Sequence, residues 1–371
     1  MKIDKLKVLY KGREVGTLAL TVNRRVAFAY DDDWLKHGFS ISPFSLPLKK
    51  QVFIPEKDYF YGLFGVFADS LPDAWGNLLL TRLMKEKGIR MDQITMLDRL
   101  AIVGDTGMGA LTYKPEMKLE DHQEMKNLDY LCEECHKILN TEYSESLDQI
   151  YQMGGTSGGA RPKILVEIDG EPWMIKFPAH TDGKDIGKME YDYSMCAKAC
   201  EIPMSDTKLF PSEKCQGYFG TKRFDRRGTE RIHVLTAAAL LELDFMQPSL
   251  DYHSLMKLTK ILTGNQKKDL ENMYRYMCFN VFAHNRDDHS KNFSYIYSEE
   301  EDRWSLSPAY DMTYSNTYYG EHTTMVNGNG KNPGIEDVIQ VGKSAGLKKE
   351  WCEETALRIQ DVINEQLKDY L

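Results

Sequence analysis

A short polar motif near the C-terminus constrains the fold of this chain more than any other feature. Asp287 is followed five residues later by Asn292, and a second acidic residue, Asp311, comes about twenty residues after that. Upstream, residues 269–283 carry apolar side chains near helical spacing, and downstream residues 293–297 alternate and are aromatic, which is typical of a strand. The predicted order is therefore a helix, a polar loop, a β-hairpin and then an aspartate.

This spacing of acidic and amide side chains matches that of protein-kinase-type phosphoryl transfer. In that chemistry one aspartate accepts the proton of the attacking hydroxyl, while an asparagine and a second aspartate hold the magnesium ions that bridge the phosphates. Carboxylate and amide oxygens suit such hard cations. Asp287 is therefore the candidate base, and Asn292 and Asp311 are the candidate magnesium ligands. Asp, Asn and His also cluster in ordinary polar turns, so the motif needs support from elsewhere in the chain.

A glycine-rich segment, residues 154–163, precedes an apolar strand predicted at residues 164–166. Glycines allow backbone amides to approach phosphate oxygens closely, although the same composition also suits a flexible linker between domains. The segment has neither the Walker spacing nor the spaced glycines of eukaryotic-type kinases. Nucleotide contact and a simple linker both remain open on this motif alone.

A lysine and a glutamate further along the chain favour the nucleotide-binding interpretation. Lys176 lies among apolar residues in a strand predicted at 173–177, and a buried lysine needs a partner such as a phosphate. Glu190 begins a helix predicted at 190–200. An ion pair between a strand lysine and a helix glutamate is a recurrent device for placing the phosphates in kinases, although both residues could be ordinary surface charges. Along the chain, the glycine-rich loop comes first, then the lysine and the glutamate, and then the Asp, Asn and Asp of the C-terminal motif. This order favours a kinase.

Composition predicts a soluble, globular protein of about two domains. The chain has 371 residues, of which 42% are hydrophobic and 28% charged. No apolar run is long enough to span a bilayer and the first residues do not form a signal peptide, so we expect a cytoplasmic protein without membrane contact. Seven irregularly spaced cysteines suggest reduced thiols. A net charge of −9 argues against strong nucleic-acid binding by the chain itself.

The rest of the sequence indicates where the parts of the protein begin and end. Residues 5–30 have the alternation of a small antiparallel meander, residues 58–100 are mostly helical, and residues 117–150 are charged and read as connecting helices. The composition changes abruptly at the glycine-rich segment. The predicted divisions are an N-terminal domain (1–115), a helical connector (116–150), and a third domain (151–371) with lobes 151–230 and 231–371.

Three other motifs have structural explanations. Cys132, Cys135 and His136 spell a haem-attachment motif, but that chemistry needs an export context, and the cysteines suit one apolar face of a helix. The glycines of residues 104–109 precede a short strand predicted at 111–113, which indicates a structural turn. The basic residues between positions 222 and 231 are interpreted as a solvated face.

Together these motifs resemble the HipA family, the serine/threonine kinase toxins of bacterial type II toxin–antitoxin modules, over nearly the whole chain. The matching segments are residues 67–76, 103–105 and 109–111 in the N-terminal part, and 158–163, 223–226, 287–292 and 310–313 in the kinase part. The resemblance implies a mixed α/β (α+β) fold. A small N-terminal β/α domain would precede a bilobal protein-kinase-like domain with a largely helical C-lobe.

The resemblance also implies roles for individual residues, with ATP and Mg²⁺ as cofactors. Family members can autophosphorylate a serine of the glycine-rich loop, which ejects the loop and silences the kinase; the matching position here is Thr156, with Ser157 beside it. The implied roles are Gly158, Gly159, Ala160 and Lys163 in the nucleotide loop, Lys176 on the phosphates with Glu190, Lys222 to Phe224 as the hinge near the adenine, Asp287 as base, His289 beside the phosphates, and Asn292 and Asp311 on magnesium.

The function implied is transfer of the ATP γ-phosphoryl group to a serine or threonine of a protein substrate. The implied partner is a small helix-turn-helix antitoxin, through which the chain would reach DNA only indirectly. A small-molecule kinase and a catalytically inactive kinase-fold binding module are the alternatives. A metal-dependent nuclease using Asp287, Asp288 and Asp311 ranks lower, because it gives the glycine-rich loop and Lys176 no role.

Overall fold

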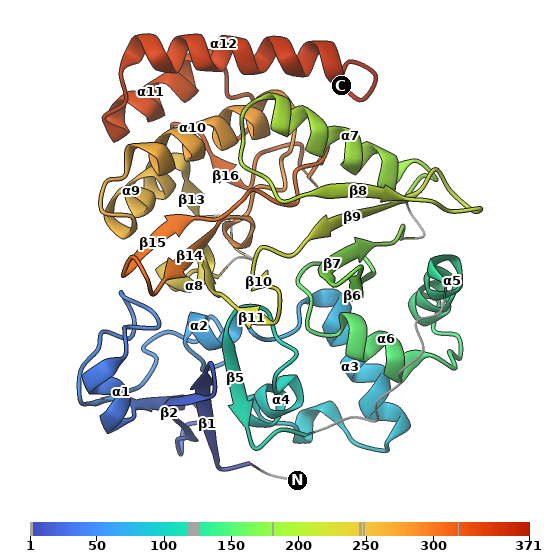
Figure 1. Ribbon diagram of the computed structural model, residues 1–371, viewed down its shortest axis with the longest axis vertical. Coiled ribbons are helices and arrows are strands. Elements are labelled where there is room, and N and C mark those ends of the chain that lie inside the picture. The colour runs from blue at the N-terminus through green and yellow to red at the C-terminus, as the bar shows by residue number, and fades with distance from the viewer. Residues whose placement is uncertain (1–2, 118–126, 180–181, 245–246, 248, 318) are drawn as a thin grey trace. The chain divides into compact units, whose positions relative to one another are not determined.

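The computed structural model describes residues 3–117, 127–179, 182–244, 247, 249–317 and 319–371 (Figure 1). The chain divides into two compact units. Unit 1 comprises Met1–Gly187, Phe210–Leu235 and Ala239–Glu242, and unit 2 comprises Lys188–Leu209, Thr236–Ala238 and Leu243–Leu371. Helices and strands both contribute substantially to the chain, as the mixed α/β prediction requires.

The first sheet of unit 1 is antiparallel and confirms the meander predicted for residues 5–30. Along its first strand Leu6, Val8 and Tyr10 are buried while Lys5 and Lys7 are exposed, the period-two pattern of a sheet with one face on the core. The first two strands are joined at Lys11 and Gly12, whose backbones both have positive φ, as tight hairpin turns require. The sheet order is β4-β3-β2-β1-β5, with β1 at Lys5–Tyr10, β2 at Arg13–Leu20, β3 at Val26–Tyr30, β4 at Val52–Phe53 and β5 at Leu111–Lys114.

The helices of unit 1 confirm the helical character predicted for residues 58–100, and two helices, α5 and α6, occur in the predicted connector. One of them starts at a capping box in which Thr95 and Asp98 satisfy each other's backbone amides. Residues 118–126 of the predicted connector lie outside the described residues. The helices are α1 (Asp32–His37), α2 (Gly65–Ala68), α3 (Ala74–Glu86), η1 (Met91–Gln93), α4 (Met96–Val103), α5 (Leu128–Leu139) and α6 (Leu147–Gly154).

A second sheet of unit 1 carries the predicted strands around Lys176. Its antiparallel strands are β6 (Lys163–Ile168), β7 (Glu171–Lys176) and β9 (Tyr218–Lys222). Their apolar side chains share one core with α3, α5 and α6, in which Trp75, Ile150, Ile164 and Ile175 are buried. Cys132 and Cys135 are buried in the same core on α5, as the helical-face interpretation predicted. A short hairpin follows, formed by β10 (Arg226–Arg227) and β11 (Glu230–Arg231).

Unit 2 is built around α10, which packs against α9, α11 and α12 (Figure 1). After α10 come the polar loop, the hairpin of β14 and β15, and Asp311, so the order predicted from the sequence is confirmed. The elements of unit 2 are β13 (Leu250–Asp251), α9 (Tyr252–Leu262), α10 (Lys267–Phe282), η2 (Ser290–Asn292), β14 (Ser294–Ser298), β15 (Arg303–Leu306), β16 (Thr324–Met325), α11 (Ile335–Ala345) and α12 (Lys349–Gln366). Elements with residues in both units are α7 (Ile186–Ala199), β8 (Thr207–Phe210), β12 (His233–Thr236) and α8 (Ala237–Leu241).

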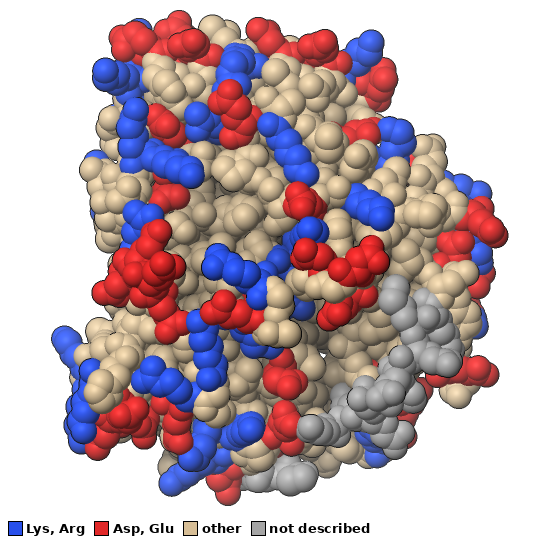
Figure 2. Space-filling model, in the orientation of Figure 1, with Lys and Arg blue, Asp and Glu red and all other residues tan. Residues whose placement is uncertain are grey.

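On the face drawn in Figure 2, basic and acidic side chains are interspersed, without a large patch of either sign. Among the helices of the described residues, none combines the length and the apolar character needed to cross a bilayer.

Candidate phosphoryl-transfer site

The loop that carries the predicted catalytic residues is anchored to the end of α10. The chain leaves the helix through His284, whose φ of 53° lies in the left-handed region that His, Asn and Asp tolerate better than most residues. The backbone amide of Asn285 donates to the carbonyl of Asn280 at 2.9 Å, and its side-chain Nδ2 donates to Asn280 Oδ1 at 2.9 Å. These bonds fix the loop's starting point on a rigid helix.

The structure brings Asp287, His289 and Asn292 together within this loop. The Asp287 side chain is 59% exposed, and its Oδ1 lies 3.9 Å from His289 Nε2. His289 Nδ1 accepts a hydrogen bond from the Lys291 amide at 3.3 Å, so in the neutral ring the proton is on Nε2, the nitrogen nearer Asp287. Asn292 Nδ2 donates to the Asp287 carbonyl at 2.6 Å. The loop therefore presents a solvent-accessible carboxylate with a histidine ring beside it.

Asp288, the next residue, has the opposite environment. Its side chain is 0% exposed and accepts hydrogen bonds from the Tyr252 hydroxyl at 2.9 Å, His322 Nδ1 at 3.0 Å and the Thr324 amide at 3.0 Å. Sequence reasoning gave Asp288 no role except in the nuclease alternative. Because this carboxylate is enclosed and fully hydrogen-bonded, it holds the loop in place, and the structure does not favour its use as a metal ligand.

The segments that carry the two predicted magnesium ligands are joined by a tyrosine that sequence reasoning missed. The hydroxyl of Tyr276, on α10, lies 3.1 Å from the carbonyl of Asn292 and 2.8 Å from the carbonyl of Tyr310, the residue before Asp311. Burial raises the pKa of Tyr276 far above its ordinary value, so the hydroxyl keeps its proton and acts as a donor. In the sequence this residue is indistinguishable from any core aromatic side chain of a helix.

Asp311 itself has a backbone conformation that is uncommon outside glycine. Its φ is 53°, and its carbonyl accepts a hydrogen bond from Asn285 Nδ2 at 3.3 Å. Residues held in sparsely populated regions of φ and ψ cluster at functional sites, where the surrounding contacts enforce them. The loop after α10 and the Asp311 segment are thus fastened to each other at two points, through Asn285 and through Tyr276.

The donor atoms in this part of unit 2 suit magnesium. Because Asn292 uses its Nδ2 to hold the Asp287 carbonyl, its amide is oriented with Oδ1 as the remaining group, which is the atom that a hard cation requires. Within the described ranges, no three His, Cys, Asp or Glu side chains gather as a metal site. Magnesium does not need such a cluster, since it is commonly bound by one or two protein oxygens together with water and substrate phosphates.

The glycine-rich segment of unit 1 is held in a defined conformation. The Gly159 amide donates to Asp73 Oδ2 at 3.2 Å, and the Gly159 carbonyl accepts from the Trp75 amide at 3.1 Å. Lys163 is buried, and its ammonium group donates to the Gly158 carbonyl. These contacts with the start of α3 favour an ordered loop over the flexible-linker interpretation.

The candidate phosphosites of this loop are buried in the structure. Thr156 Oγ1 donates to the carbonyl of Thr106 at 2.9 Å, and Ser157 Oγ donates to the carbonyl of Gly154 at 2.5 Å. The Ser157 hydroxyl therefore caps local backbone, whereas the Thr156 hydroxyl ties the loop to the turn at residues 104–109. A phosphate on either residue would require the loop to leave this position.

The remaining candidate residues lie in both units. Lys176 is buried on β7, as predicted, with its ammonium group 5.5 Å from the centre of the Phe219 ring. Lys222 is the last residue of β9, two positions before Phe224, and it forms an ion pair with Glu171 at 3.5 Å. Glu190 is buried on α7 in unit 2, whereas Lys176 belongs to unit 1, and their ion pair stays a prediction. Ala160 lies in the glycine-rich loop.

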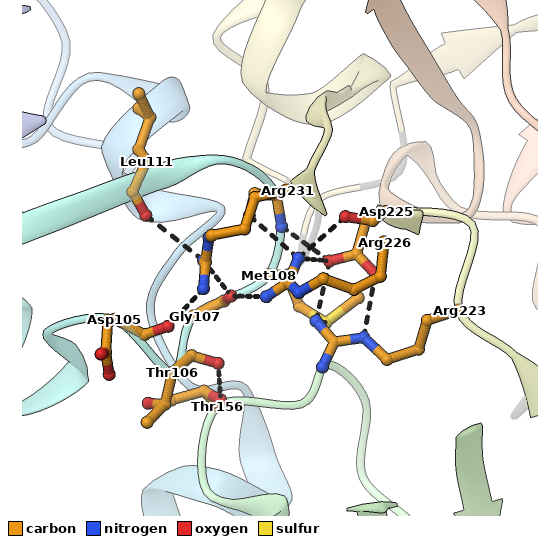
Figure 3. Close-up of polar contacts among 11 residues, drawn as sticks. Asp105, Thr106, Gly107, Met108, Leu111, Thr156, Arg223, Asp225, Arg226 and Arg231 are labelled. Carbon is orange, nitrogen blue, oxygen red and sulfur yellow. Dashed lines mark hydrogen bonds and ion pairs between the residues drawn. The ribbon is translucent and has the colours of Figure 1, made fainter. Parts of the chain in front are cut away.

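The prediction that the basic run at 222–231 is a solvated face is wrong for three of its arginines, whereas Arg227 is exposed. Figure 3 shows Arg223, Arg226 and Arg231 gathered around Asp225, whose side chain is 1% exposed. Arg223 and Arg226 form ion pairs with Asp225 at 2.8 and 2.7 Å, and the Gly109 amide donates to the same carboxylate at 2.9 Å. Arg223 and Arg226 can be largely buried because their counter-ion, Asp225, is part of the same run.

This arginine cluster, defined as Arg223, Arg226 and Arg231 around Asp225, also closes the turn predicted at residues 104–109. Arg226 and Arg231 both donate to the Gly107 carbonyl, at 2.9 and 2.6 Å. Burial alone would raise the pKa of Asp225, but the charges and hydrogen bonds of Arg223 and the charge of Arg226 outweigh it and hold that pKa below its usual value. Burial lowers the pKa of Arg226 to about 9, which leaves it charged at neutral pH.

The fold and these motifs define a mixed helix-and-sheet protein of the kinase-like class, and comparison with known proteins gives the family. The model of the HipA-like C-terminal domain matches residues 155–367, and that of the HipA N-terminal domain matches residues 6–114. The chain therefore belongs to the HipA family, which confirms the resemblance inferred from its motifs. A comparison with curated proteins finds no match.

Solved structures support the fold. The chain is similar to HipA in the complex of HipA, HipB and operator DNA from the toxin–antitoxin system of Shewanella oneidensis MR-1, with a TM-score of 0.73 and 15% identity over 98% of this chain and 90% of that one. The proinflammatory kinase CtkA of Helicobacter pylori aligns with a TM-score of 0.38 and 12% identity, over 55% of this chain and 90% of that one. A likeness as weak as the second does not define a fold.

Proposed function

We propose that this chain is an ATP-dependent serine/threonine protein kinase and the toxin of a toxin–antitoxin module. The observation that carries the proposal is the geometry of the loop after α10. An exposed carboxylate, Asp287, lies beside His289, and the amide of Asn292 is turned by its bond to the Asp287 carbonyl. Phosphoryl transfer requires little covalent chemistry from a protein, so positioning and charge stabilisation of this kind account for most of the catalysis.

Each group then has a task in the proposed reaction. Asp287 orients the substrate hydroxyl and accepts its proton, and His289 lies where its Nε2–H can donate to a phosphate oxygen. Asn292 and Asp311 would hold Mg²⁺, which when bound neutralises charge on the phosphates. Lys176 and the glycine-rich loop are assigned to the phosphates of ATP, and the backbone of residues 222–224 to the adenine.

The partner proposed is a small DNA-binding antitoxin. The similar HipA of Shewanella oneidensis was solved together with HipB and its operator DNA, and family membership supports an analogous assembly here. The net charge of −9 is consistent with DNA contact through the partner rather than through this chain. The protein substrate would be phosphorylated on a serine or threonine.

Calorimetric titration with ATP and Mg²⁺ tests the metal assignment. Asp311→Ala should weaken magnesium-dependent ATP binding by at least about tenfold, because a carboxylate that would bind the metal directly is lost. Asp302→Ala is the matched control, since Asp302 also has a left-handed backbone, at φ 44°, but lies in the β14–β15 turn. Equal affinity of wild type and Asp311→Ala would remove Asp311 from the site. Binding without any transfer of labelled phosphate would instead favour the inactive binding module.

A further inference from the structure

Hydrogen bonds of two tyrosines, Tyr276 and Tyr310, join the segment that carries Asn292 to the segment that carries Asp311. The Tyr276 hydroxyl contacts the carbonyls of Asn292 and Tyr310, at 3.1 and 2.8 Å. In return, the Tyr310 hydroxyl donates to the Lys291 carbonyl at 2.7 Å and lies 2.6 Å from Ser294 Oγ. Each tyrosine therefore ties the end of the catalytic loop to the segment that ends in Asp311.

The Tyr276 side chain is itself held rigidly. It is 3% exposed, it belongs to the middle of the 16-residue helix α10, and its ring lies 5.1 Å from the ring of Phe293. The single proton of this hydroxyl is shared between two backbone carbonyls, so both carbonyl oxygens are held within hydrogen-bond distance of one atom on a rigid helix. Because each carbonyl belongs to a predicted magnesium ligand or to its neighbour, the hydroxyl acts on the spacing of the ligands without touching the metal.

We propose that Tyr276 is a positioning residue that sets the magnesium affinity of the site by fixing the distance between the Asn292 and Asp311 segments. The inference rests on the proposed function, because it takes Asn292 and Asp311 as the ligands. Magnesium demands near-ideal octahedral geometry, so its binding is sensitive to small changes in ligand spacing. Partners that orient the ligands of a metal site affect metal affinity by about 10–100-fold in known proteins.

A second tyrosine of the same helix provides a matched control. Tyr274 is also buried on α10, and its hydroxyl donates to the Cys352 carbonyl on α12 at 2.9 Å. Replacing either tyrosine by phenylalanine removes one buried hydroxyl and keeps the ring. If Tyr276 serves only the core, the two substitutions should have similar consequences.

The experiment measures ATP affinity across a magnesium titration in wild type, Tyr276→Phe and Tyr274→Phe. We expect Tyr276→Phe to raise the magnesium concentration for half-saturation by about tenfold, the scale of one lost hydrogen bond. Affinity without metal should stay within about twofold, and excess magnesium should restore binding. Tyr274→Phe should titrate like wild type.

The outcomes separate this inference from the function on which it rests. If wild type binds ATP with no dependence on magnesium, both the proposed metal site and the role of Tyr276 are wrong. If wild type depends on magnesium and Tyr276→Phe titrates like Tyr274→Phe, only the role of Tyr276 is overturned. Should Tyr276→Phe fail to fold, Tyr310→Phe serves instead, because it removes the hydrogen bond from the Tyr310 hydroxyl to the Lys291 carbonyl. This variant must show the same shift in the magnesium concentration for half-saturation. A Tyr310→Phe variant without that shift would also reject the inference.

Discussion

Asp287 and Asp288 are neighbours in the chain, and the structure gives them opposite environments. The carboxylate of Asp287 is 59% exposed, whereas that of Asp288 is 0% exposed. The short spacing between these aspartates and Asn292 is visible in the sequence, because all three residues lie in one short segment. The difference between the two depends on Tyr252, His322 and Thr324, which are distant in sequence, so no local pattern could have revealed it.

Asp288→Asn should therefore lower the free energy of unfolding by about 3 kcal/mol, because the amide cannot accept all of the hydrogen bonds that the buried carboxylate accepts. Asp287→Asn, at an exposed position, should change it by no more than about 0.5 kcal/mol. Urea denaturation of the two variants measures both effects. An Asp288→Asn variant as stable as the wild type would show that this network does not hold the loop.

The arginine cluster shows how a charge pattern can mislead. A run of basic residues is usually solvated, but here Asp225 lies within the run and carbonyls of residues 105–111 accept from the same guanidinium groups. Those carbonyls are more than a hundred positions away in the chain, as for Arg231 and Gly107. The sequence contains the partners, but only the fold brings them together.

Asp225→Asn should destabilise the protein by about 3–5 kcal/mol at neutral pH, because buried arginines lose their counter-charge. The pKa of Asp225 is lowered in the folded state, so its contribution is complete above the ordinary aspartate pKa of about 3.9 and is lost as the pH falls through the folded value. Denaturation curves recorded between neutral and acidic pH should show the two proteins converging at the acidic end. A constant difference across the series would contradict this assignment.

At the scale of helices and strands, hydrophobic periodicity predicted most of the elements. The helix expected at 269–283 is Lys267–Phe282, and the strand expected at 293–297 is Ser294–Ser298. The helix expected at 190–200 instead begins at Ile186. Gly187 lies in the first turn of this helix, and a Cβ there would lie 2.2 Å from the Gly217 carbonyl oxygen, so close packing requires glycine at this position.

The glycine-rich loop carries a prediction about modification. A phosphate on Thr156 or Ser157 would add close to two negative charges, and it could not be accommodated at these buried positions. We expect any phosphorylated form to have the loop displaced and low kinase activity. Intact-mass analysis after incubation with ATP and magnesium, followed by peptide mapping, measures the modification. An active enzyme with no phosphate in residues 151–163 would reject autoinhibition and leave the kinase assignment standing.

For the whole molecule, the order of the motifs carried more information than any single one. A glycine-rich loop, Lys176, Glu190, Asp287, Asn292 and Asp311 occur in the order of a kinase, and together with the N-terminal motifs they carry the resemblance to the HipA family that the family models confirm. The residues that support these groups were not predicted. Tyr276, Asn285 and Asp288 act through tertiary contacts, and their residue types are common in cores and turns.

Transfer of labelled phosphate from γ-labelled ATP to protein, compared between wild type and Asp287→Asn, tests the proposed kinase activity. Wild type should label protein in the presence of magnesium. Asp287→Asn should lower the transfer rate by about 10²–10⁴-fold, the range expected for loss of a general base. Its affinity for ATP and magnesium should be unchanged, because Asp287 is assigned to the hydroxyl and not to the nucleotide. An Asp287→Asn variant that transfers phosphate at the wild-type rate would contradict the account.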